Sequence, residues 1–118
     1  MKVLVCGTRR VGKPYNKLVD DALNEANKRH GELLIIEGCC KDSADEYAEQ
    51  WAERHDVPIK HYPSKAGNFL KRNVEMVKEA QEVLAFWDGW SYGTAHTIAQ
   101  AVLHYKDVHV IPLRGALK

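Results

Sequence analysis

Short apolar runs recur along the chain, separated by longer segments in which apolar residues are spaced differently. The runs show little polar alternation and several are rich in β-branched residues. Both features are typical of strands buried on both faces of a parallel sheet. We therefore predict five strands, over residues 2–6, 33–37, 57–62, 83–87 and 108–111.

The intervening segments have the spacing of amphipathic helices, with apolar residues recurring every three or four positions. Four helices are predicted, with stripes that contain Leu18, Ala22 and Ala26; Ala44, Ala48 and Ala52; Leu70, Val74 and Val77; and Ile98, Ala99, Val102 and Leu103. Ser43, followed three residues later by Glu46, predicts a capping box at the start of the second helix.

Strands and helices alternate strictly, with short connections between them. This order implies right-handed crossovers and a parallel sheet covered by helices on both faces. The predicted fold is thus an α/β, Rossmann-like three-layer sandwich with a five-stranded, mainly parallel sheet and about four helices. A length of 118 residues suits one domain, so we expect residues 1–118 to form a single unit.

The composition is that of a globular domain, with 45% hydrophobic and 28% charged residues. The formal net charge is +1, so no global field favours nucleic acid or a membrane surface as a partner. No apolar run approaches the roughly 20 residues of a membrane-spanning helix. An anionic ligand would therefore have to be held by a local cluster of donors.

The three cysteines, Cys6, Cys39 and Cys40, are odd in number and follow no secretory segment. These features predict reduced thiols and a cytoplasmic location. Cys39 and Cys40 are adjacent, which is a poor spacing for metal ligands, and no C-x-x-C pair is present. We accordingly predict neither a metal site nor a bound cofactor.

Ligands of open parallel sheets bind beyond the carboxyl ends of the strands. Glycines, hydroxyls and charged side chains follow the first, second and fourth predicted strands. The candidate ligand-binding residues at these ends are Gly7, Thr8, Arg9, Gly38, Asp45, Asp88, Gly89, Ser91, Gly93 and Thr94. Glycines admit a ligand close to the backbone, and amides at a helix start bind anions.

Residues 88–94 allow two interpretations. Their glycines, hydroxyls and free amides suit a phosphate cradle, but they also suit a tight turn with an N-cap and no ligand. The position of this loop, after a strand in the predicted central part of the sheet, favours the ligand.

Residues 7–13 have the first part of a P-loop pattern, and residues 83–88 resemble a Walker B strand. Pro14, however, stands where a serine or threonine would bind Mg²⁺, and proline offers no side-chain ligand. A phosphoryl-transfer P-loop is therefore disfavoured.

Arg72 and Asn73 lie near the start of the third predicted helix. An arginine there can reach the ligand cleft, where its planar fork suits phosphate, although a solvated arginine on a helix surface is the commoner case.

Three aromatic residues and one histidine flank the fourth strand's loop. Trp87, Trp90 and Tyr92 offer rings either for stacking on a base or for packing against the protein. His96 is close enough to serve as an acid or base, but we expect it to be an exposed surface histidine.

With these residues assembled, the chain resembles the SLOG superfamily, and within it the branch related to YspA and YpsA. Residues 3–9 are similar to the family's V-x-V-x-G-x-R, and residues 37–45 to its H-G-G-A-x-G-A-D. Residues 72–76 are similar to R-N-x-x-M, and residues 89–94 stand where the family has G-G-x-G-T.

This resemblance implies a Rossmann-like fold that binds nucleotides or nucleotide-derived signals. It favours Arg72 and Asn73 as ligand-facing residues, because they stand at the family's ligand-facing motif. Analogy with small SLOG-like folds also implies self-association as a homodimer or higher homo-oligomer, with the helix that carries Trp51 as a candidate surface.

The chain departs from related sequences at three positions. The LOG enzymes, which cleave the N-glycosidic bond of cytokinin nucleotides, carry G-G-x-G-T-x-x-E, but Thr97 stands in place of this glutamate. Cys39 and Ser43 replace two glycines of the second motif, which reduces backbone freedom near the ligand.

Three functions are consistent with these observations. The first is binding or sensing of a nucleotide or nucleotide-derived small molecule, which the missing glutamate favours. The second is an N-glycosidic bond enzyme, of nucleotide phosphoribohydrolase or nucleoside deoxyribosyltransferase type. Arg72 would then orient phosphate or ribose, and Asp45, Glu75 or Asp88 would supply the carboxylate. The third is a protein-interaction module with a degenerate pocket.

Overall fold

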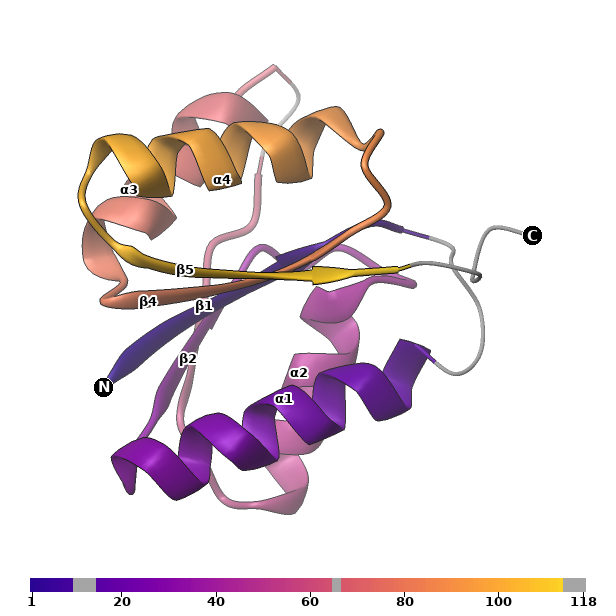
Figure 1. Ribbon diagram of the computed structural model, residues 1–118, viewed down its shortest axis with the longest axis vertical. Helices are drawn as coiled ribbons and strands as arrows, with labels where there is room; N and C mark the ends of the chain where they lie inside the picture. Colours follow the sequence, from indigo (N-terminus) through magenta and orange to yellow (C-terminus); the bar gives the residue numbers. More distant parts are fainter. Residues whose placement is uncertain (10–14, 65–66, 114–118) are drawn as a thin grey trace.

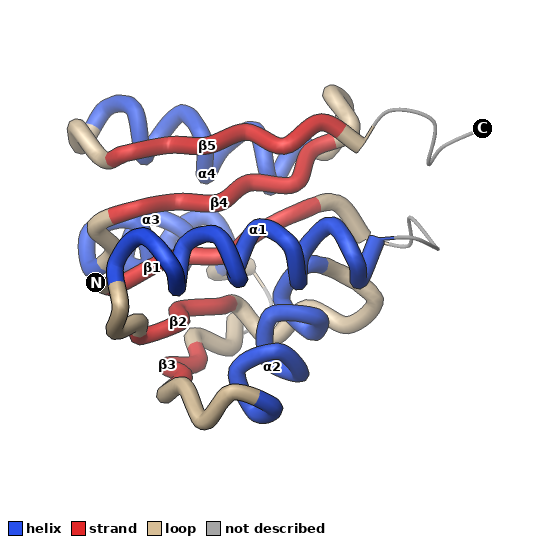
Figure 2. Tube along the Cα trace, turned by 60° about the horizontal axis from the view of Figure 1, so that its bottom comes forward, coloured by secondary structure: helices blue, strands red, loops and turns tan. Residues whose placement is uncertain are grey.

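The computed structural model describes residues 1–9, 15–64 and 67–113. Five strands form one sheet: β1 (Lys2–Gly7), β2 (Leu34–Glu37), β3 (Ile59–His61), β4 (Glu82–Trp87) and β5 (Asp107–Pro112). Four helices lie between them in sequence: α1 (Tyr15–His30), α2 (Ala44–Arg54), α3 (Phe69–Glu79) and α4 (Tyr92–Leu103). All strand pairs are parallel, in the order β3-β2-β1-β4-β5 (Figure 2). The predicted Rossmann-like α/β fold is confirmed, with a sheet that is wholly parallel.

The helices cover the sheet on both faces, α1 and α2 on one and α3 and α4 on the other (Figure 1). Because side chains alternate along a strand, Val3 and Val5 of β1 pack with the first pair of helices. Leu4 and Cys6 pack on the opposite face, with α3. This double burial explains why β1 has an unbroken apolar sequence.

The strand order reverses at the centre of the sheet. The chain moves outward from β1 to β2 and β3, and then returns to pair β4 with the other edge of β1. Such a switch point separates the loops that follow the two central strands and leaves a crevice at their carboxyl ends.

The predicted strand boundaries differ most from the structure at β3. Residues 57–62 are predicted as strand, but β3 contains only Ile59–His61. The amide of Val57 donates to the carbonyl of Ala52 at the end of α2 (2.9 Å), and Pro58 has no amide to donate. Because these contacts at the end of α2 involve residues 57 and 58, β3 begins to pair with β2 only at Ile59.

The predicted capping box at α2 is half formed. Ser43 is the N-cap, and its Oγ accepts a hydrogen bond from the amide of Asp45 (3.1 Å). Glu46 instead accepts from the amide of Asp42 (2.9 Å), one residue earlier than a capping box requires. The cap fixes where α2 begins, and so places Asp45 at the end of the sheet.

Trp51 itself belongs to the core, so its side chain takes no part in the exposed surface of α2. Its side chain is fully buried, and its Nε1 donates to Oδ1 of Asn24 on α1 (2.9 Å).

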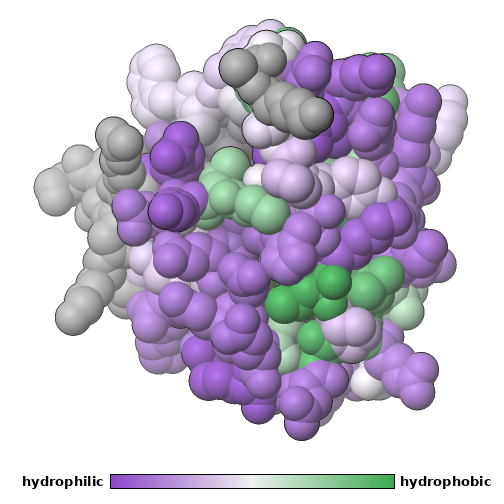
Figure 3. All heavy atoms as spheres, turned by 180° about the vertical axis from the view of Figure 1, so that it is seen from behind, coloured by the Kyte–Doolittle hydropathy of each residue, from purple (hydrophilic) through white to green (hydrophobic). Residues whose placement is uncertain are grey.

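The face of the molecule opposite to the view of Figure 1 is mostly hydrophilic, with a hydrophobic patch in its lower half (Figure 3). None of the helices in the described part of the chain is both long and apolar enough to cross a membrane.

Candidate functional site

A cavity of about 590 Å³ lies at the carboxyl ends of β1 and β4, a size typical of small-molecule sites. Most of the predicted ligand-binding residues line it: Gly7, Thr8, Arg9, Asp45, Arg72, Asn73, Asp88, Ser91, Gly93 and Thr94. Its wall also contains residues that the sequence did not single out for binding: Cys6, Cys40, Ser64, Phe69, Met76 and Thr97. The structure thus brings together segments that are far apart in the sequence.

Three predicted residues do not line this cavity. Gly38 lies behind Arg72, Gly89 forms the turn after β4 with a φ of +89°, and Glu75 is exposed on α3. Glu75 is therefore poorly placed to supply a carboxylate to a ligand in the cavity. The P-loop-like segment continues through Gly12, Lys13 and Pro14, which lie outside the described residues.

Asp88 organises the loop between β4 and α4. Its Oδ1 accepts hydrogen bonds from the amides of Trp90 and Ser91, both at 2.8 Å. Burial opposes ionisation, but these hydrogen bonds prevail and lower the pKa of Asp88. The amide of Asp88 donates to Oγ1 of Thr8 (3.1 Å), which ties this loop to the end of β1. Asp88 thus acts as a fixed anion that shapes the loop.

The first turn of α4 is left without a side-chain cap. Oγ of Ser91, the N-cap residue, lies 2.9 Å from Thr8 Oγ1 and 3.0 Å from Asp88 Oδ1, and makes no capping bond to the helix. No acidic residue occupies this turn. Because the first amides of a helix lack intrahelical partners, those of Gly93 and Thr94 are available at the cavity wall. A helix end of this kind attracts anions.

Arg72 reaches from α3 to the end of β2. Its Nη1 donates to the carbonyl of Gly38 (2.7 Å), and its Nη2 donates to Oδ1 of Asn73 (3.1 Å). Its Nε is buried and has no hydrogen-bond partner among the described residues. The side chain is therefore part of the cavity wall rather than a solvated arginine on the helix surface.

Asp45 is a buried carboxyl in the same wall, with only 5% of the residue exposed. Its Oδ2 accepts from the amides of Gly38 and Cys40, both at 3.1 Å. Burial raises the pKa of Asp45 to about 6, outweighing the opposing effects of the Cys40 amide and Arg72. Asp45 can consequently exchange a proton near neutral pH, which is typical of groups with a functional role.

One family model matches the part of the chain that carries the first of these residues. Residues 1–66 match the family model of the YspA, cpYpsA-related SLOG family. The chain belongs to this family. The match spans β1 to β3 and includes Gly7, Gly38 and Asp45, whereas Arg72 and the start of α4 lie beyond it. Comparison with curated proteins gives no match.

In this SLOG protein the aromatic ring at the cavity is not one of those expected. Trp87 donates from Nε1 to the carbonyl of Ser91 (3.0 Å), while Trp90 and Tyr92 are exposed and do not line the cavity. Phe69 does line it and is 41% exposed. The sequence signal was present, because Phe69 precedes Arg72 by one helical turn and shares its side of α3.

Two residues of α4 bear on whether this SLOG protein could act as an enzyme. Thr97, which stands where the LOG enzymes have a glutamate, lines the cavity and donates from Oγ1 to the carbonyl of Gly93 (3.1 Å). His96 does not line the cavity; it is half-buried rather than exposed as expected, and its Nδ1 has no partner among the described residues. The carboxylates in the described wall are therefore those of Asp45 and Asp88.

Proposed function

We propose that this protein binds a nucleotide or nucleotide-derived small molecule in the cavity at the carboxyl ends of β1 and β4. The observation that carries the proposal is the pairing, in one cavity, of the uncapped start of α4 with Arg72. A phosphate would accept from the amides of Gly93 and Thr94 and pair with the guanidinium of Arg72 in the cavity wall. A neutral ligand would leave both features unused.

The rest of the wall suits the nucleoside part of such a ligand. Phe69 presents an aromatic ring on which a base can stack, and Thr8 and Ser64 add hydroxyls for ribose. Asp45 faces the same space with a carboxyl that hydrogen-bonds sugar hydroxyls in either protonation state. We infer binding or sensing as the primary role, because Thr97 supplies no carboxylate and Asp88 is committed to its loop.

Hydrolysis or transfer at an N-glycosidic bond is the second candidate, and Asp45 favours it. A carboxyl with a pKa of about 6 can donate or accept a proton at an oxocarbenium-like centre. Incubation with nucleoside monophosphates and nucleosides, followed by assay for free base, separates the two functions. Absence of base release at high protein concentration would eliminate the enzyme and leave the binding function intact.

Thermal unfolding in the presence of a ligand panel tests the binding proposal. The panel contains nucleoside mono-, di- and triphosphates, cyclic nucleotides, NAD and ADP-ribose. A ligand at a hundredfold excess over its Kd adds about 2.7 kcal/mol of stability, which raises Tm by several degrees. Arg72→Ala should lose this shift, whereas Lys71→Ala should keep it, because Lys71 is exposed beside Arg72 and does not line the cavity.

If no nucleotide stabilises the wild-type protein, the binding proposal is wrong, and a protein-interaction module with a degenerate pocket becomes the better account. A shift that survives in Arg72→Ala would instead place the ligand elsewhere.

We also propose a cytoplasmic location and self-association for this protein. The three cysteines are free thiols, as expected in a reducing compartment. Exposed apolar side chains gather at the end of α4 and on β5, namely Val102, Leu103, Tyr105 and Val110. This area, rather than Trp51, is the proposed contact between copies, and sedimentation analysis of Leu103→Glu against the wild type tests it.

A further inference from the structure

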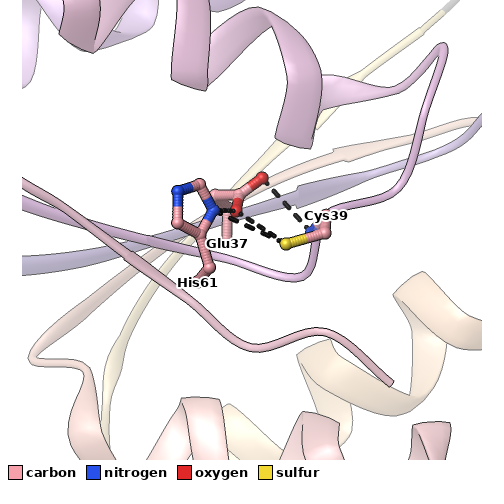
Figure 4. Close-up of side chains that lie close together, drawn as sticks. All are labelled: Glu37, Cys39 and His61. Carbon is pink, nitrogen blue, oxygen red and sulfur yellow. Dashed lines mark hydrogen bonds and ion pairs between the residues drawn. The ribbon is translucent and has the colours of Figure 1, made fainter. Parts of the chain in front are cut away.

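Three side chains with metal-binding atoms converge at the carboxyl ends of β2 and β3, outside the cavity lining (Figure 4). Glu37 ends β2 and is paired in register with His61, which ends β3; Cys39 follows two residues after Glu37. Their ligand atoms all lie within 4.8 Å of one another. The sequence predicted no metal site because its cysteines are poorly spaced along the chain. This cluster forms instead through the pairing of two strands.

The separations of Cys39 Sγ from the other two ligand atoms suit a tetrahedral ion. Cys39 Sγ lies 3.5 Å from His61 Nδ1 and 3.3 Å from Glu37 Oε1. For Zn–S and Zn–N bonds of about 2.3 and 2.05 Å, a tetrahedral angle places sulfur and nitrogen about 3.5 Å apart. His61 Nδ1 contacts Glu37 Oε1 directly, closer than two ligands of one ion lie, so an ion would replace this contact and bind between the two atoms.

The buried carboxylate of Glu37 favours binding of a cation at this cluster. Its side chain is fully buried, and among the described residues its ion-pair partner is His61. Buried carboxylates are stable when they are paired or coordinate a metal. A divalent ion at this point would satisfy the charge more fully than a single imidazole N–H does.

The backbone of Cys39 gives a second, independent indication. Its φ is +63°, in the left-handed region that glycine adopts readily and residues with a Cβ adopt at a cost. Such strained residues cluster at functional sites. Retention of a side chain at this position therefore points to a use for the thiol.

Glu49 gives the third indication. Its Oε1 lies 3.5 Å from His61 Nε2, the ring nitrogen that faces away from the cluster. Metal-bound histidines usually donate their second N–H to a carboxylate, which fixes the tautomer.

We propose that Glu37, Cys39 and His61 bind one Zn²⁺ ion, with the fourth position open to solvent. On binding, the Cys39 thiol loses its proton to solvent as the sulfur–zinc bond forms. The proton between His61 Nδ1 and Glu37 Oε1 also leaves, to solvent or to Nε2 of the same ring, and His61 binds through Nδ1 with its proton on Nε2. Cys39 and the His61 side chain are exposed, so the ion can enter from solvent. Sulfur, imidazole and carboxylate ligands together favour zinc over magnesium or calcium.

Cobalt substitution tests this site, because Co²⁺ bound to a thiolate gives a charge-transfer absorption band and tetrahedral d–d bands. We expect the wild-type protein to bind one equivalent of Co²⁺ with these bands, and Zn²⁺ to abolish them. Cys39→Gly should lose the thiolate band, and His61→Gln should weaken Co²⁺ binding at least tenfold. Cys40→Ser and His104→Gln are the matched controls and should bind as the wild type does.

Cys39→Gly also separates metal binding from folding. Glycine suits the observed φ, so this variant should unfold, without metal, at a Tm equal to or above that of the wild type. His61→Gln changes an exposed side chain and provides a second folded variant. The proposal is overturned if wild-type protein gives no thiolate–cobalt band, or if the band is lost in Cys40→Ser and kept in Cys39→Gly.

Discussion

The guanidinium of Arg72 and the carbonyl of Gly38 are joined by a hydrogen bond of 2.7 Å, which anchors a side chain from α3 to the end of β2. The contact leaves no room beside Gly38, where a Cβ would lie 2.6 Å from Arg72 Nη1. Glycine is therefore needed at this position by the arginine, whose guanidinium is held in the cavity wall by the backbone at the end of β2.

Gly38→Ala should displace Arg72 without unfolding the protein. The clashing atoms belong to the far end of a flexible side chain, which can move away. We expect stability to change by less than about 1 kcal/mol and nucleotide affinity to fall about tenfold or more, because a charge-assisted hydrogen bond contributes about 1.5–3 kcal/mol. Calorimetric titration and urea unfolding measure the two effects, and unchanged affinity would show that Arg72 does not bind the ligand.

Gly7→Ala, in contrast, should lower the stability of the protein. A Cβ at this position would lie 2.3 Å from the Tyr15 hydroxyl and 2.8 Å from the carbonyl of Phe86, its partner on β4. The carbonyl belongs to the paired sheet and cannot yield, so we expect a loss of about 1–3 kcal/mol in the free energy of unfolding. Adding Tyr15→Phe should recover part of this loss, since it removes one of the two contacts. Absence of any destabilisation would show that β1 is freer to shift than the structure indicates.

The order of elements and the end of the sheet that carries the cavity could be predicted from sequence. Apolar periodicity determines which residues of β1 face each layer of helices, and alternation determines the parallel topology. The glycines and hydroxyls after β1 and β4 then meet because parallel strands share one carboxyl edge. These local sequence patterns are compatible with only one kind of arrangement of strands and helices, and so they predict the fold.

Other features of the site depend on long-range register, which local patterns do not encode. Glu37 and His61 meet because β2 and β3 pair at that offset, and the offset follows from how α2 ends before Pro58. Trp51 fills the core between helices although an aromatic residue on a helix equally suits an interface. Phe69 could have been identified from sequence, because it lies one helical turn before Arg72 on the same side of α3.

His96→Ala should leave nucleotide affinity within a few-fold of the wild type. His96 follows Gly93 and Thr94 closely in sequence, but its side chain does not line the cavity. Its Nδ1 is buried without a partner among the described residues, so the substitution should cost little stability. Titration calorimetry on both proteins measures the effect. Complete loss of binding would mean that His96 turns toward the ligand when the ligand binds.

Glu82→Gln tests a charge cluster at the far end of the sheet. Glu82 is buried at the start of β4 and accepts from Arg29 (2.8 Å), while His30 (2.6 Å) and His109 (3.1 Å) also lie against its carboxylate. Burial opposes ionisation, but the hydrogen bonds from Arg29 and His30 prevail and lower the pKa of Glu82. We expect a loss of about 1.5–3 kcal/mol at neutral pH, because the substitution replaces the charge-assisted hydrogen bond from Arg29 with a neutral one.

The pH dependence of the Glu82 effect has a defined sign. A carboxyl whose pKa is lowered on folding stabilises the protein above its unfolded pKa and loses this contribution as pH falls through the folded value. The difference between wild type and Glu82→Gln should therefore shrink below the ordinary glutamate value of 4.5. Urea unfolding across this range measures it, and a difference that is independent of pH would indicate a packing effect instead.

Asp45→Asn should show the opposite sign, because the pKa of Asp45 is raised on folding, from 3.8 to about 6. The ionised carboxyl then destabilises the folded state, fully above the folded pKa and not at all below the unfolded one. This destabilisation amounts to about 3 kcal/mol for a shift of about two units. The stability of Asp45→Asn relative to the wild type should accordingly decline by up to this amount as pH falls from about 8 to about 4.

The same variant connects this titration to function. NMR of the carboxyl carbon in the wild type should give a midpoint near 6, in agreement with the unfolding data. If the protein releases base from nucleotides, Asp45→Asn should abolish release while leaving nucleotide binding within a few-fold, because the amide keeps the contacts with Gly38 and Cys40 but not the proton exchange. A variant that retains full base release would assign the chemistry to a group other than Asp45.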